Sequence, residues 1–347
     1  MMADTMKAMV LRGVHDLRKD REPLTLEQVP MPAPGPGELL LKVLACGVCH
    51  TELDEIEGRT PPEAYPVIPG HEVVGLVTEA GPGADRSRIG DNVGVGWFFS
   101  SCGSCSYCRN GSENLCREFR ATGRDADGGY AEYMRVPEGS AFPLPGHLSH
   151  TGAAPLLCAG AIGYRSLRLA GIGNGDSLGL TGFGGSAHLV LKMVRSRYPD
   201  SKVHVFARDP EERDFALELG AVWAGDTTDI SPVKLRAIID TTPVWKPVVE
   251  ALKNLAPGGR LVINAIRKED ADHDYLENLD YTLHLWMERE IKSVANVSPG
   301  DISSFLHLAE EMRVEPEVSE FDLEGANEAL LQLRRGGIRG AKVLKMD

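Results

Sequence analysis

Four cysteines stand close together in the sequence, at Cys102, Cys105, Cys108 and Cys116. Their spacing is C-x2-C-x2-C-x7-C, and two residues between cysteines allow a tight turn to present both sulfurs to one tetrahedral ion at about 2.3 Å. Four thiolates would fill the coordination shell and leave no open position, so the spacing predicts a structural zinc site. An iron–sulfur cluster and unmetallated thiols are the alternatives, but the bacterial ferredoxin pattern closes with a shorter gap and a proline.

Three further cysteines lie outside this cluster, which makes seven in all. An odd number, in a long chain whose start lacks an apolar leader, disfavours a disulfide framework. Cys49 precedes His50, Thr51 and Glu52, and Cys158 ends an apolar segment. A lone cysteine is more often a small buried residue than a metal ligand, so each of these positions is weak evidence by itself.

A glycine-rich segment is the second pattern with a chemical meaning. It reads G-x-G-x-x-A through Gly182, Phe183, Gly184, Gly185 and Ala187. The segment follows a predicted strand and opens a predicted helix, and in that context glycines allow a tight turn and close approach of a pyrophosphate. The helix N-terminus adds partial positive charge. We therefore expect a dinucleotide-binding turn.

The elements that must position these residues change in character along the chain. Residues 1–155 show short apolar runs, such as 38–44 and 73–78, between Pro- and Gly-rich turns, which indicates a β-rich domain. Strands are then expected at 177–182, 202–207, 235–240 and 259–265, and helices at 186–197, 210–220 and 247–255. Strands that alternate with helices indicate an α/β fold with a doubly wound parallel sheet. The tail shows helical patterns at 301–313 and 323–335 and a strand at 341–345.

The composition excludes several classes of function. The chain has 347 residues, with 37 Lys and Arg against 50 Asp and Glu, a formal net charge of −13. Nucleic acids and anionic membranes attract concentrated positive charge, so neither is an expected partner. There is no apolar run of the roughly 20 residues that a membrane helix needs. We expect a cytoplasmic protein.

Taken together, the motifs resemble the zinc-dependent medium-chain alcohol dehydrogenase family, in its bacterial and yeast-like branch. The resemblance covers nearly the whole chain. It rests on Gly70-His71-Glu72-x2-Gly75-x5-Gly81, on the cysteine cluster that follows, and on the segment 154–160 that contains Cys158. It implies a GroES-like catalytic domain at 1–158 with a zinc lobe at about 97–120, a Rossmann coenzyme domain at 159–297, and a C-terminal return at 298–347.

The resemblance also implies a catalytic zinc and a reaction. Cys49, His71 and Cys158 would be the ligands, with Glu72 as a nearby or alternating ligand. Zinc would polarise the substrate oxygen while hydride passes between an alcohol or aldehyde and NAD(P)(H). Thr51 would start the proton relay, and Asp54 stands where the family often continues it with a histidine. Glu52 takes the place of an Asp that orients the zinc-bound histidine, and Cys46 has no role beyond a small buried residue.

Cofactor choice depends on the end of the second strand of the coenzyme domain. There the NAD-binding carboxylate is replaced by Ala207, followed by Arg208, and a guanidinium pairs well with a 2′-phosphate. The sequence thus favours NADP over NAD, although Asp209 gives NAD a possible acid. By resemblance, His50 meets the pyrophosphate. Pro299 stands where relatives carry a pyrophosphate-binding arginine.

Substrate and assembly are less determined. By resemblance, Trp97 is a wall of the substrate pocket, or else a core residue, and Thr60 replaces a tryptophan that narrows the pocket for small alcohols. A polyol or other secondary-alcohol dehydrogenase of the same fold is an alternative, as is a non-catalytic dinucleotide-binding or redox-sensing relative. Relatives associate through the edge strand of the coenzyme sheet, so a homotetramer or homodimer is expected.

Overall fold

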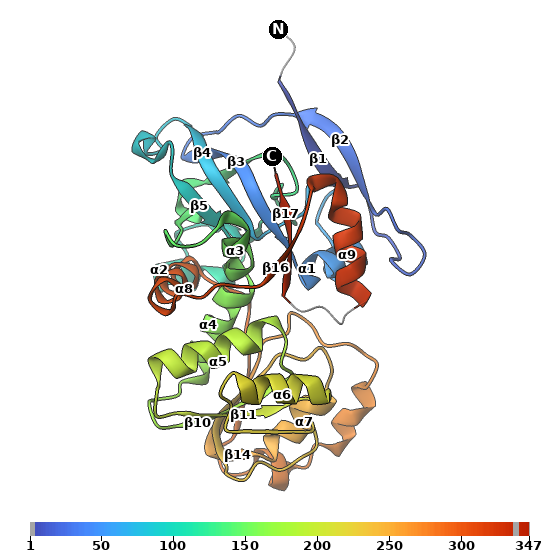
Figure 1. Ribbon diagram of the computed structural model, residues 1–347, viewed down its shortest axis with the longest axis vertical. Helices are drawn as coiled ribbons and strands as arrows, with labels where there is room; N and C mark the ends of the chain where they lie inside the picture. The colour runs from blue at the N-terminus through green and yellow to red at the C-terminus, as the bar shows by residue number, and fades with distance from the viewer. Residues whose placement is uncertain (1–3, 336–339, 347) are drawn as a thin grey trace. The chain divides into compact units, whose positions relative to one another are not determined.

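The computed structural model describes residues 4–335 and 340–346. These residues form two compact units (Figure 1). Unit 1 is built from 1–158 together with 297–347, and unit 2 from 159–296. The chain therefore leaves unit 1 once and returns to it, with Val297 already on the unit 1 side.

Unit 1 is organised around a seven-stranded sheet in the order β16-β17-β3-β4-β5-β9, with β8 paired to β3. Its strands are β3 (Glu38–Val48), β4 (Val73–Ala80), β5 (Asn92–Val95), β8 (Tyr133–Pro137), β9 (Phe142–Pro143), β16 (Val318–Phe321) and β17 (Ala341–Lys345). Beside it, β1 (Thr5–Leu11) pairs antiparallel with β2 (Leu24–Pro30), and β6 (Phe98–Ser100) with β7 (Arg120–Ala121). The helices are α1 (His50–Ile56), α2 (Ser106–Arg109), α3 (His150–Ala153), α8 (Pro299–Met312) and α9 (Ala326–Arg335).

The C-terminal strand is part of this sheet. β17 pairs antiparallel with β3, so that Leu344 lies opposite Cys46, while β16 adds in parallel at the edge. Leu344 and Cys46 are both fully buried in the same apolar core. Pairing and burial together hold the tail against the strand that leads into α1.

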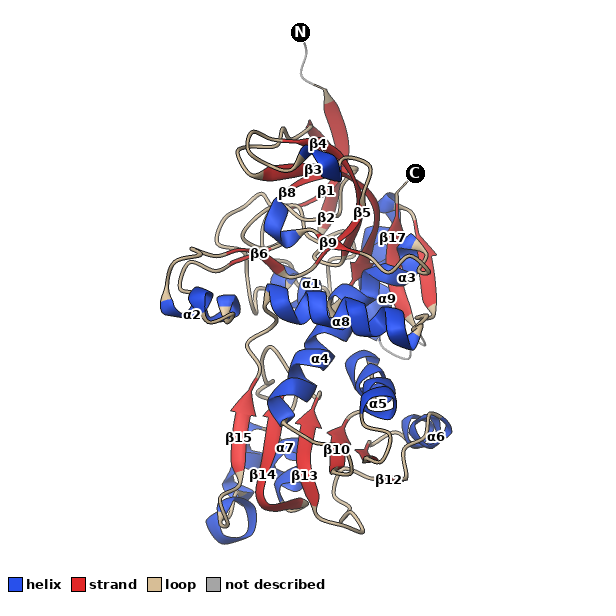
Figure 2. Cartoon of the chain, turned by 90° about the vertical axis from the view of Figure 1, so that its left-hand side faces the viewer, coloured by secondary structure: helices blue, strands red, loops and turns tan. Residues whose placement is uncertain are grey.

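Unit 2 contains a six-stranded sheet in the order β12-β11-β10-β13-β14-β15, and every neighbouring pair is parallel. The strands are β10 (Ser177–Thr181), β11 (Lys202–Phe206), β12 (Trp223–Gly225), β13 (Leu235–Asp240), β14 (Leu255–Ile263) and β15 (Glu290–Ser293). The helices are α4 (Ala159–Ala170), α5 (Gly185–Arg197), α6 (Pro210–Glu218) and α7 (Lys246–Leu252), and α4 and α7 lie on opposite faces of the sheet (Figure 2). This is the 3-2-1-4-5-6 order of a Rossmann fold.

Some boundaries differ from the sequence-based expectations. The strand expected at 259–265 begins and ends earlier, since β14 spans Leu255–Ile263, and its register against β13 shifts between Leu235 and Ala237. The expected helix at 247–255 accordingly ends at Leu252. α8 begins at Pro299 rather than 301, since Ser298 and Asp301 form a capping box ahead of a proline at the first helical position. α9 begins at Ala326, after a 3-10 turn.

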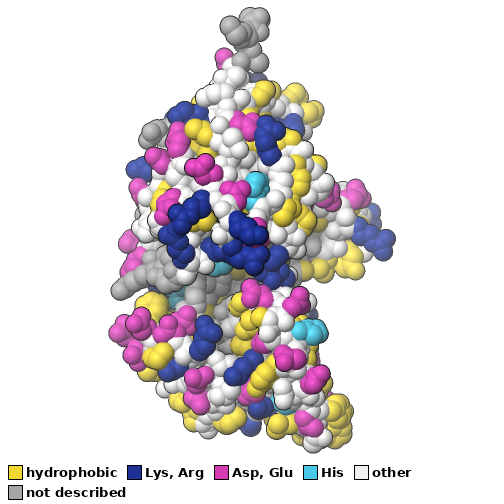
Figure 3. Space-filling view, turned by 90° about the vertical axis from the view of Figure 1, so that its right-hand side faces the viewer, with side chains coloured by type: hydrophobic (Ala, Val, Ile, Leu, Met, Phe, Trp, Pro, Cys, Tyr) yellow, Lys and Arg dark blue, Asp and Glu magenta, His cyan; other side chains and the backbone are white. Residues whose placement is uncertain are grey.

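The surface is consistent with the acidic composition. On the face shown in Figure 3, acidic and basic side chains are interspersed. In unit 1, Arg18, Arg59 and Arg334 line one pocket together with Asp16 and Glu57. Within the described ranges, none of the helices combines the length and the apolar character needed to cross a bilayer.

A backbone clamp fixes the segment that precedes His71. Gly128 N donates to Ile68 O at 2.7 Å, and Gly129 N donates to Gly70 O at 3.0 Å. A Cβ at Gly128 would lie 2.1 Å from Gly70 O. The two segments approach this closely only because Gly128 has no side chain.

We predict that Gly128→Ala destabilises unit 1 by about 1–3 kcal/mol, because the 68–70 segment must move away. Thermal unfolding measures the loss, and the zinc content of the purified protein should fall with it. Gly139→Ala is the matched control, since a Cβ there meets nothing within 4 Å. Equal melting temperatures for the two variants would contradict this account of the clamp.

Candidate active site and metal centres

The four clustered cysteines converge in space. Their sulfurs all lie within 4.8 Å of one another, with Sγ–Sγ distances of 3.5 Å between Cys105 and Cys108 and 3.9 Å between Cys102 and Cys108. A tetrahedral zinc with bonds of about 2.3 Å separates its sulfurs by roughly 3.8 Å. The Ser104 and Cys105 backbone N–H groups lower the pKa of Cys102 to about 6, which favours the thiolate that zinc binds. The cluster therefore fits a zinc ion.

A second group of possible ligands lies within the same unit. Cys49, His71, Glu72 and Cys158 each offer one atom, and these atoms also lie within 4.8 Å of one another. Cys49 is the N-cap of α1, His71 and Glu72 directly precede β4, and Cys158 directly precedes α4. The sulfurs of Cys49 and Cys158 are 3.8 Å apart, although the residues are 109 positions apart in the chain. A hydrogen bond from the Cys158 thiol lowers the pKa of Cys49 well below its usual range.

His71 has the orientation of a metal ligand. Its Nδ1 contacts the Glu52 Oε1 at 2.5 Å, and both side chains are buried. Its other ring nitrogen, Nε2, is buried and has no hydrogen-bond partner among the described residues. A buried polar atom without a partner is costly, and a carboxylate on the far nitrogen is the arrangement that orients a zinc-bound histidine. The site therefore fits a zinc ion.

The Glu72 carboxyl packs closely against the backbone of β3. A Cβ at Gly47 would lie 1.7 Å from Glu72 Oε2, so only glycine leaves room for the carboxyl at that position. Glu72 is almost fully buried, and burial together with the Cys49 charge raises the pKa of Glu72 well above its usual range. A divalent cation at this site would offset the charge of the buried carboxyl and thiols.

The expected relay residues are placed on α1 close to these ligands. Thr51 Oγ1 lies 3.7 Å from the Cys49 sulfur. Asp54, on the other hand, accepts a hydrogen bond from Arg59 Nε at 2.6 Å, so its carboxylate is engaged by a guanidinium. His50, the first residue of the helix, is exposed. The relay itself remains a prediction.

The two expected pocket residues differ in their surroundings. Trp97 is buried and lies edge-on to the His71 ring, with centroids 5.0 Å apart, while the Arg124 guanidinium lies 5.4 Å from the same indole. The Thr60 hydroxyl is buried without a partner within the described part of the chain. The sequence analysis did not single out two residues near the candidate ligands: Arg124, which lies against Trp97, and Glu55, which is buried three residues after Glu52 on α1. For Glu55, the i,i+3 spacing from Glu52 was the available signal.

In unit 2, the glycine-rich turn has an open backbone. Gly182 has φ = +72°, and a Cβ there would lie 3.0 Å from Thr242 Cγ2. At Gly184 and Gly185 a Cβ would meet nothing within 4 Å, which leaves the start of α5 open to a pyrophosphate. Phe183 instead packs against Phe215, with centroids 5.8 Å apart, and Ala187 is fully buried. The turn therefore fits a dinucleotide.

The residues expected to read the ribose follow β11 directly. Ala207 is buried and its N–H donates to Gly225 O at 3.0 Å, while Arg208 is exposed. Asp209 is the N-cap of α6, and its carboxylate accepts from Glu211 N at 2.9 Å. Asp209, the acid that could have served the ribose of NAD, therefore caps the N-terminus of α6.

Two positions that lacked a role in the sequence now have local explanations. Pro299 is the first residue of α8, so it serves the start of that helix. Cys46 is fully buried, and a Cβ at Gly70 or Gly129 would lie within 3.0 Å of its sulfur. Cys46 is thus a packing residue, as expected.

Comparisons with known proteins agree with this geometry. Residues 35–146 match the alcohol dehydrogenase GroES-like domain family. The chain is 44% identical over 331 residues to a probable alcohol dehydrogenase, AdhA, of Mycobacterium tuberculosis, covering 94% of this chain and 93% of that protein. It is 32% identical to an alcohol dehydrogenase of Geobacillus stearothermophilus, covering 94% and 97%.

Among solved structures, a cinnamyl alcohol dehydrogenase of Sorghum bicolor superposes with a TM-score of 0.82 at 29% identity, covering 99% of this chain and 98% of that one. The sequence relatives are similar over nearly their whole length. The segment 35–146 that the family matches contains all the candidate zinc ligands except Cys158. The chain therefore belongs to the zinc-dependent medium-chain alcohol dehydrogenase family, and it is an NAD(P)-dependent alcohol dehydrogenase.

Proposed function

We propose that this enzyme binds two zinc ions per chain, one structural and one catalytic, and transfers hydride between NADP(H) and an alcohol/aldehyde pair. The observation that carries the catalytic assignment is His71, whose Nδ1 is held by Glu52 while the buried Nε2 has no partner in the described chain. A zinc ion there supplies a Lewis acid that stabilises negative charge on the substrate oxygen. The Cys102–Cys116 cluster, with four thiolates and no open position, has a structural role.

The residues of α1 divide the remaining tasks. Glu52 holds the His71 ring in one orientation, because its carboxylate accepts from Nδ1–H. Thr51, 3.7 Å from the Cys49 sulfur, is the hydroxyl that takes the substrate proton first. Asp54, which stands where relatives often carry a histidine, is the next acceptor, and its carboxylate accepts a hydrogen bond from Arg59 Nε. This argues for a relay that does not depend on a titrating histidine.

The substrate side is partly apolar. Trp97 is held between His71 and Arg124, which makes its edge a rigid aromatic boundary beside the zinc ligands. Thr60 is smaller than the tryptophan it replaces and leaves more room. Medium-sized and aromatic alcohols and aldehydes are therefore proposed as substrates together with small ones.

NADP is the proposed cofactor because of what surrounds Arg208. Its exposed guanidinium has no ion-pair partner in the described residues, whereas Asp209 is committed to the N-terminus of α6. Arg213 Nη1 donates to the Ala207 and Arg208 carbonyls at 2.7 and 3.0 Å and fixes the backbone at this corner. A guanidinium at this corner favours a 2′-phosphate over a 2′-hydroxyl.

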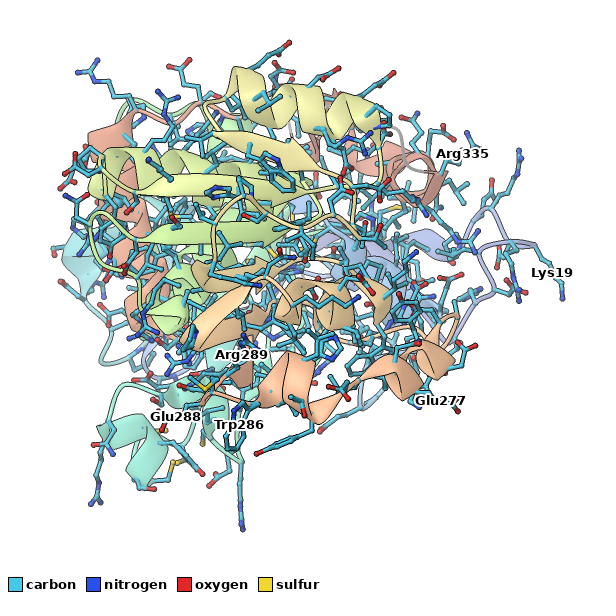
Figure 4. All side chains as sticks on the ribbon, turned by 90° about the horizontal axis from the view of Figure 1, so that it is seen from below. Lys19, Glu277, Trp286, Glu288, Arg289 and Arg335 are labelled. Carbon is cyan, nitrogen blue, oxygen red and sulfur yellow. The ribbon has the colours of Figure 1, made fainter. Side chains whose placement is uncertain are left out.

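A second copy of the chain is the proposed partner at β15. This strand is an edge of the six-stranded sheet, and all its residues are exposed. Exposed apolar side chains lie on it and just before it: Tyr281 (63%), Trp286 (54%), Leu283 (50%), Met287 (50%) and Ile291 (44%). Trp286 and Glu288 project from the periphery in Figure 4. An unpaired strand edge beside an apolar patch favours symmetric pairing into a dimer, or a tetramer of two dimers.

The two zinc sites should respond differently to loss of one ligand. We expect Cys158→Ser to lower turnover more than about 100-fold while NADPH still binds, because the chemistry needs the zinc ion and the coenzyme turn lies in unit 2. Cys105→Ser should mainly lower the melting temperature. Zinc content by mass spectrometry, NADPH fluorescence and a panel of alcohols and aldehydes measure these effects. If Cys105→Ser abolished turnover in a fully stable protein, the division of roles would be wrong.

Cofactor preference should depend on Arg208. Arg208→Ala removes the charged hydrogen bonds to a 2′-phosphate, so the Kd for NADPH should rise about 10- to 100-fold and the Kd for NADH less than about threefold. Fluorescence titration measures both. Lys202→Ala, at the other end of β11, removes the same charge as a control. A similar rise for both cofactors would refute the NADP preference.

Assembly should depend on the β15 edge. Light scattering of the native protein should give a multiple of the 37.6 kDa chain mass. Trp286→Glu combined with Ile291→Lys should shift the mass to that of one chain, because charges replace apolar contacts in the interface. Ile230→Lys, which changes another exposed isoleucine of unit 2, should leave the mass unchanged. A native mass of 37.6 kDa would rule out this interface.

A further inference from the structure

A buried ion pair lies at the carboxyl edge of the unit 2 sheet. Asp240 is the last residue of β13 and is fully buried, and the Lys268 side chain is only 8% exposed. The Lys268 ammonium donates to Asp240 Oδ2, to Thr242 O at 2.7 Å and to Val244 O at 3.1 Å. The ammonium thus has three acceptors, and two of these acceptors are carbonyl oxygens on the loop that follows β13.

The same carboxylate reaches the dinucleotide turn. Asp240 Oδ1 accepts from Thr181 Oγ1 at 2.5 Å and from Thr242 Oγ1 at 2.7 Å. Thr181 is the last residue of β10 and immediately precedes Gly182. The side chain of Thr242 lies where a Cβ on Gly182 would meet it at 3.0 Å. Lys268, Asp240 and the 241–244 loop therefore form one continuous support behind the glycine-rich turn.

The position of this support within the sheet indicates which half of the ligand it serves. The ribose-reading corner at Arg208 follows β11, which places the adenosine half of a dinucleotide on the β10–β12 side. Asp240 ends β13 and Lys268 follows β14, on the other side of the switch point between β10 and β13. The Asn264 amide nitrogen, directly after β14, is also buried without a partner in the described chain. The loop behind Gly182 therefore faces the nicotinamide half.

A buried ion pair is weak evidence of a purely stabilising role. Removing two charges from water costs several kcal/mol, and a well-packed apolar pair often stabilises as much. An ammonium that also bonds two loop carbonyls does something an apolar pair cannot, because it holds the loop in one conformation. We propose that Lys268 is a positioning residue, which acts through Asp240 and the 241–244 loop to hold the nicotinamide half of the NAD(P)(H) site. This inference rests on the proposed function.

The test separates the two halves of the cofactor by their binding constants. Lys268→Met alone would leave the Asp240 charge buried and unpaired, a change that could prevent folding. The double variant Lys268→Met/Asp240→Asn removes both charges and keeps the fold testable. Lys246→Met, which removes an exposed lysine that lies against the Tyr275 ring, is the matched control. The holoenzyme is titrated with NADPH, with NADH and with adenosine 2′,5′-bisphosphate, which carries only the adenosine half.

We expect the double variant to bind both NADPH and NADH at least about 10-fold more weakly, while its affinity for adenosine 2′,5′-bisphosphate changes less than about twofold. The single variant Lys268→Arg keeps the positive charge beside Asp240, so it should bind NADPH and NADH more tightly than the double variant does. Unchanged NADPH and NADH affinity in the folded double variant would overturn the proposal. So would an equal loss for all three ligands, which would mean that the pair only stabilises unit 2. A wild-type protein that binds the cofactors but oxidises no alcohol would instead count against the proposed function.

Discussion

The contact between the Glu52 carboxylate and the His71 ring is the constraint on which the candidate catalytic centre depends. It joins α1 to the segment before β4, across 19 residues of chain, and both side chains are buried. The same helix begins at Cys49, and Glu52 also accepts the Cys49 backbone N–H at 2.9 Å. One carboxylate therefore fixes the orientation of one ligand and the backbone of another. Any shift of α1 against β4 would move both.

The surroundings of this contact are built so that such a shift is resisted. Gly47 leaves room for the Glu72 carboxyl, and Gly128 allows one backbone to lie directly on another next to Gly70. β17 pairs with the end of β3, so the C-terminus holds the strand from which α1 emerges. The cost of this close packing is a buried site rich in acids and thiols. A divalent cation bound there would offset that charge, and its binding would then be coupled to the stability of unit 1.

In unit 2, the candidate site for the cofactor pyrophosphate is formed by neutral backbone groups rather than by charged side chains. The glycine-rich turn leaves the start of α5 open to a ligand. Hydrogen bonds among the residues packed behind the turn set its position, and these residues do not themselves reach the ligand. Thr181 and Thr242 share one oxygen of Asp240, and Lys268 takes the other. The charged residues in this network are buried, whereas Arg208 at the ribose corner is exposed. In the proposed assignment, support of the turn and recognition of the ribose are thus carried by different residues.

The sequence by itself determined the features whose meaning is local: the four-cysteine cluster, the glycine-rich turn, and the alternation of strands and helices that indicates a parallel sheet. Short loops bring such residues together whatever the rest of the chain does. Only the tertiary structure decided which distant residues meet. Cys49 and Cys158 are 109 positions apart and Lys268 and Asp240 are 28 apart, and no periodicity pairs them; family resemblance anticipated the first pair, and nothing anticipated the second. The start of α8 at Pro299 and the register shift between β13 and β14 were likewise decided by capping and by strand pairing, because these depend on neighbours that the local pattern does not contain.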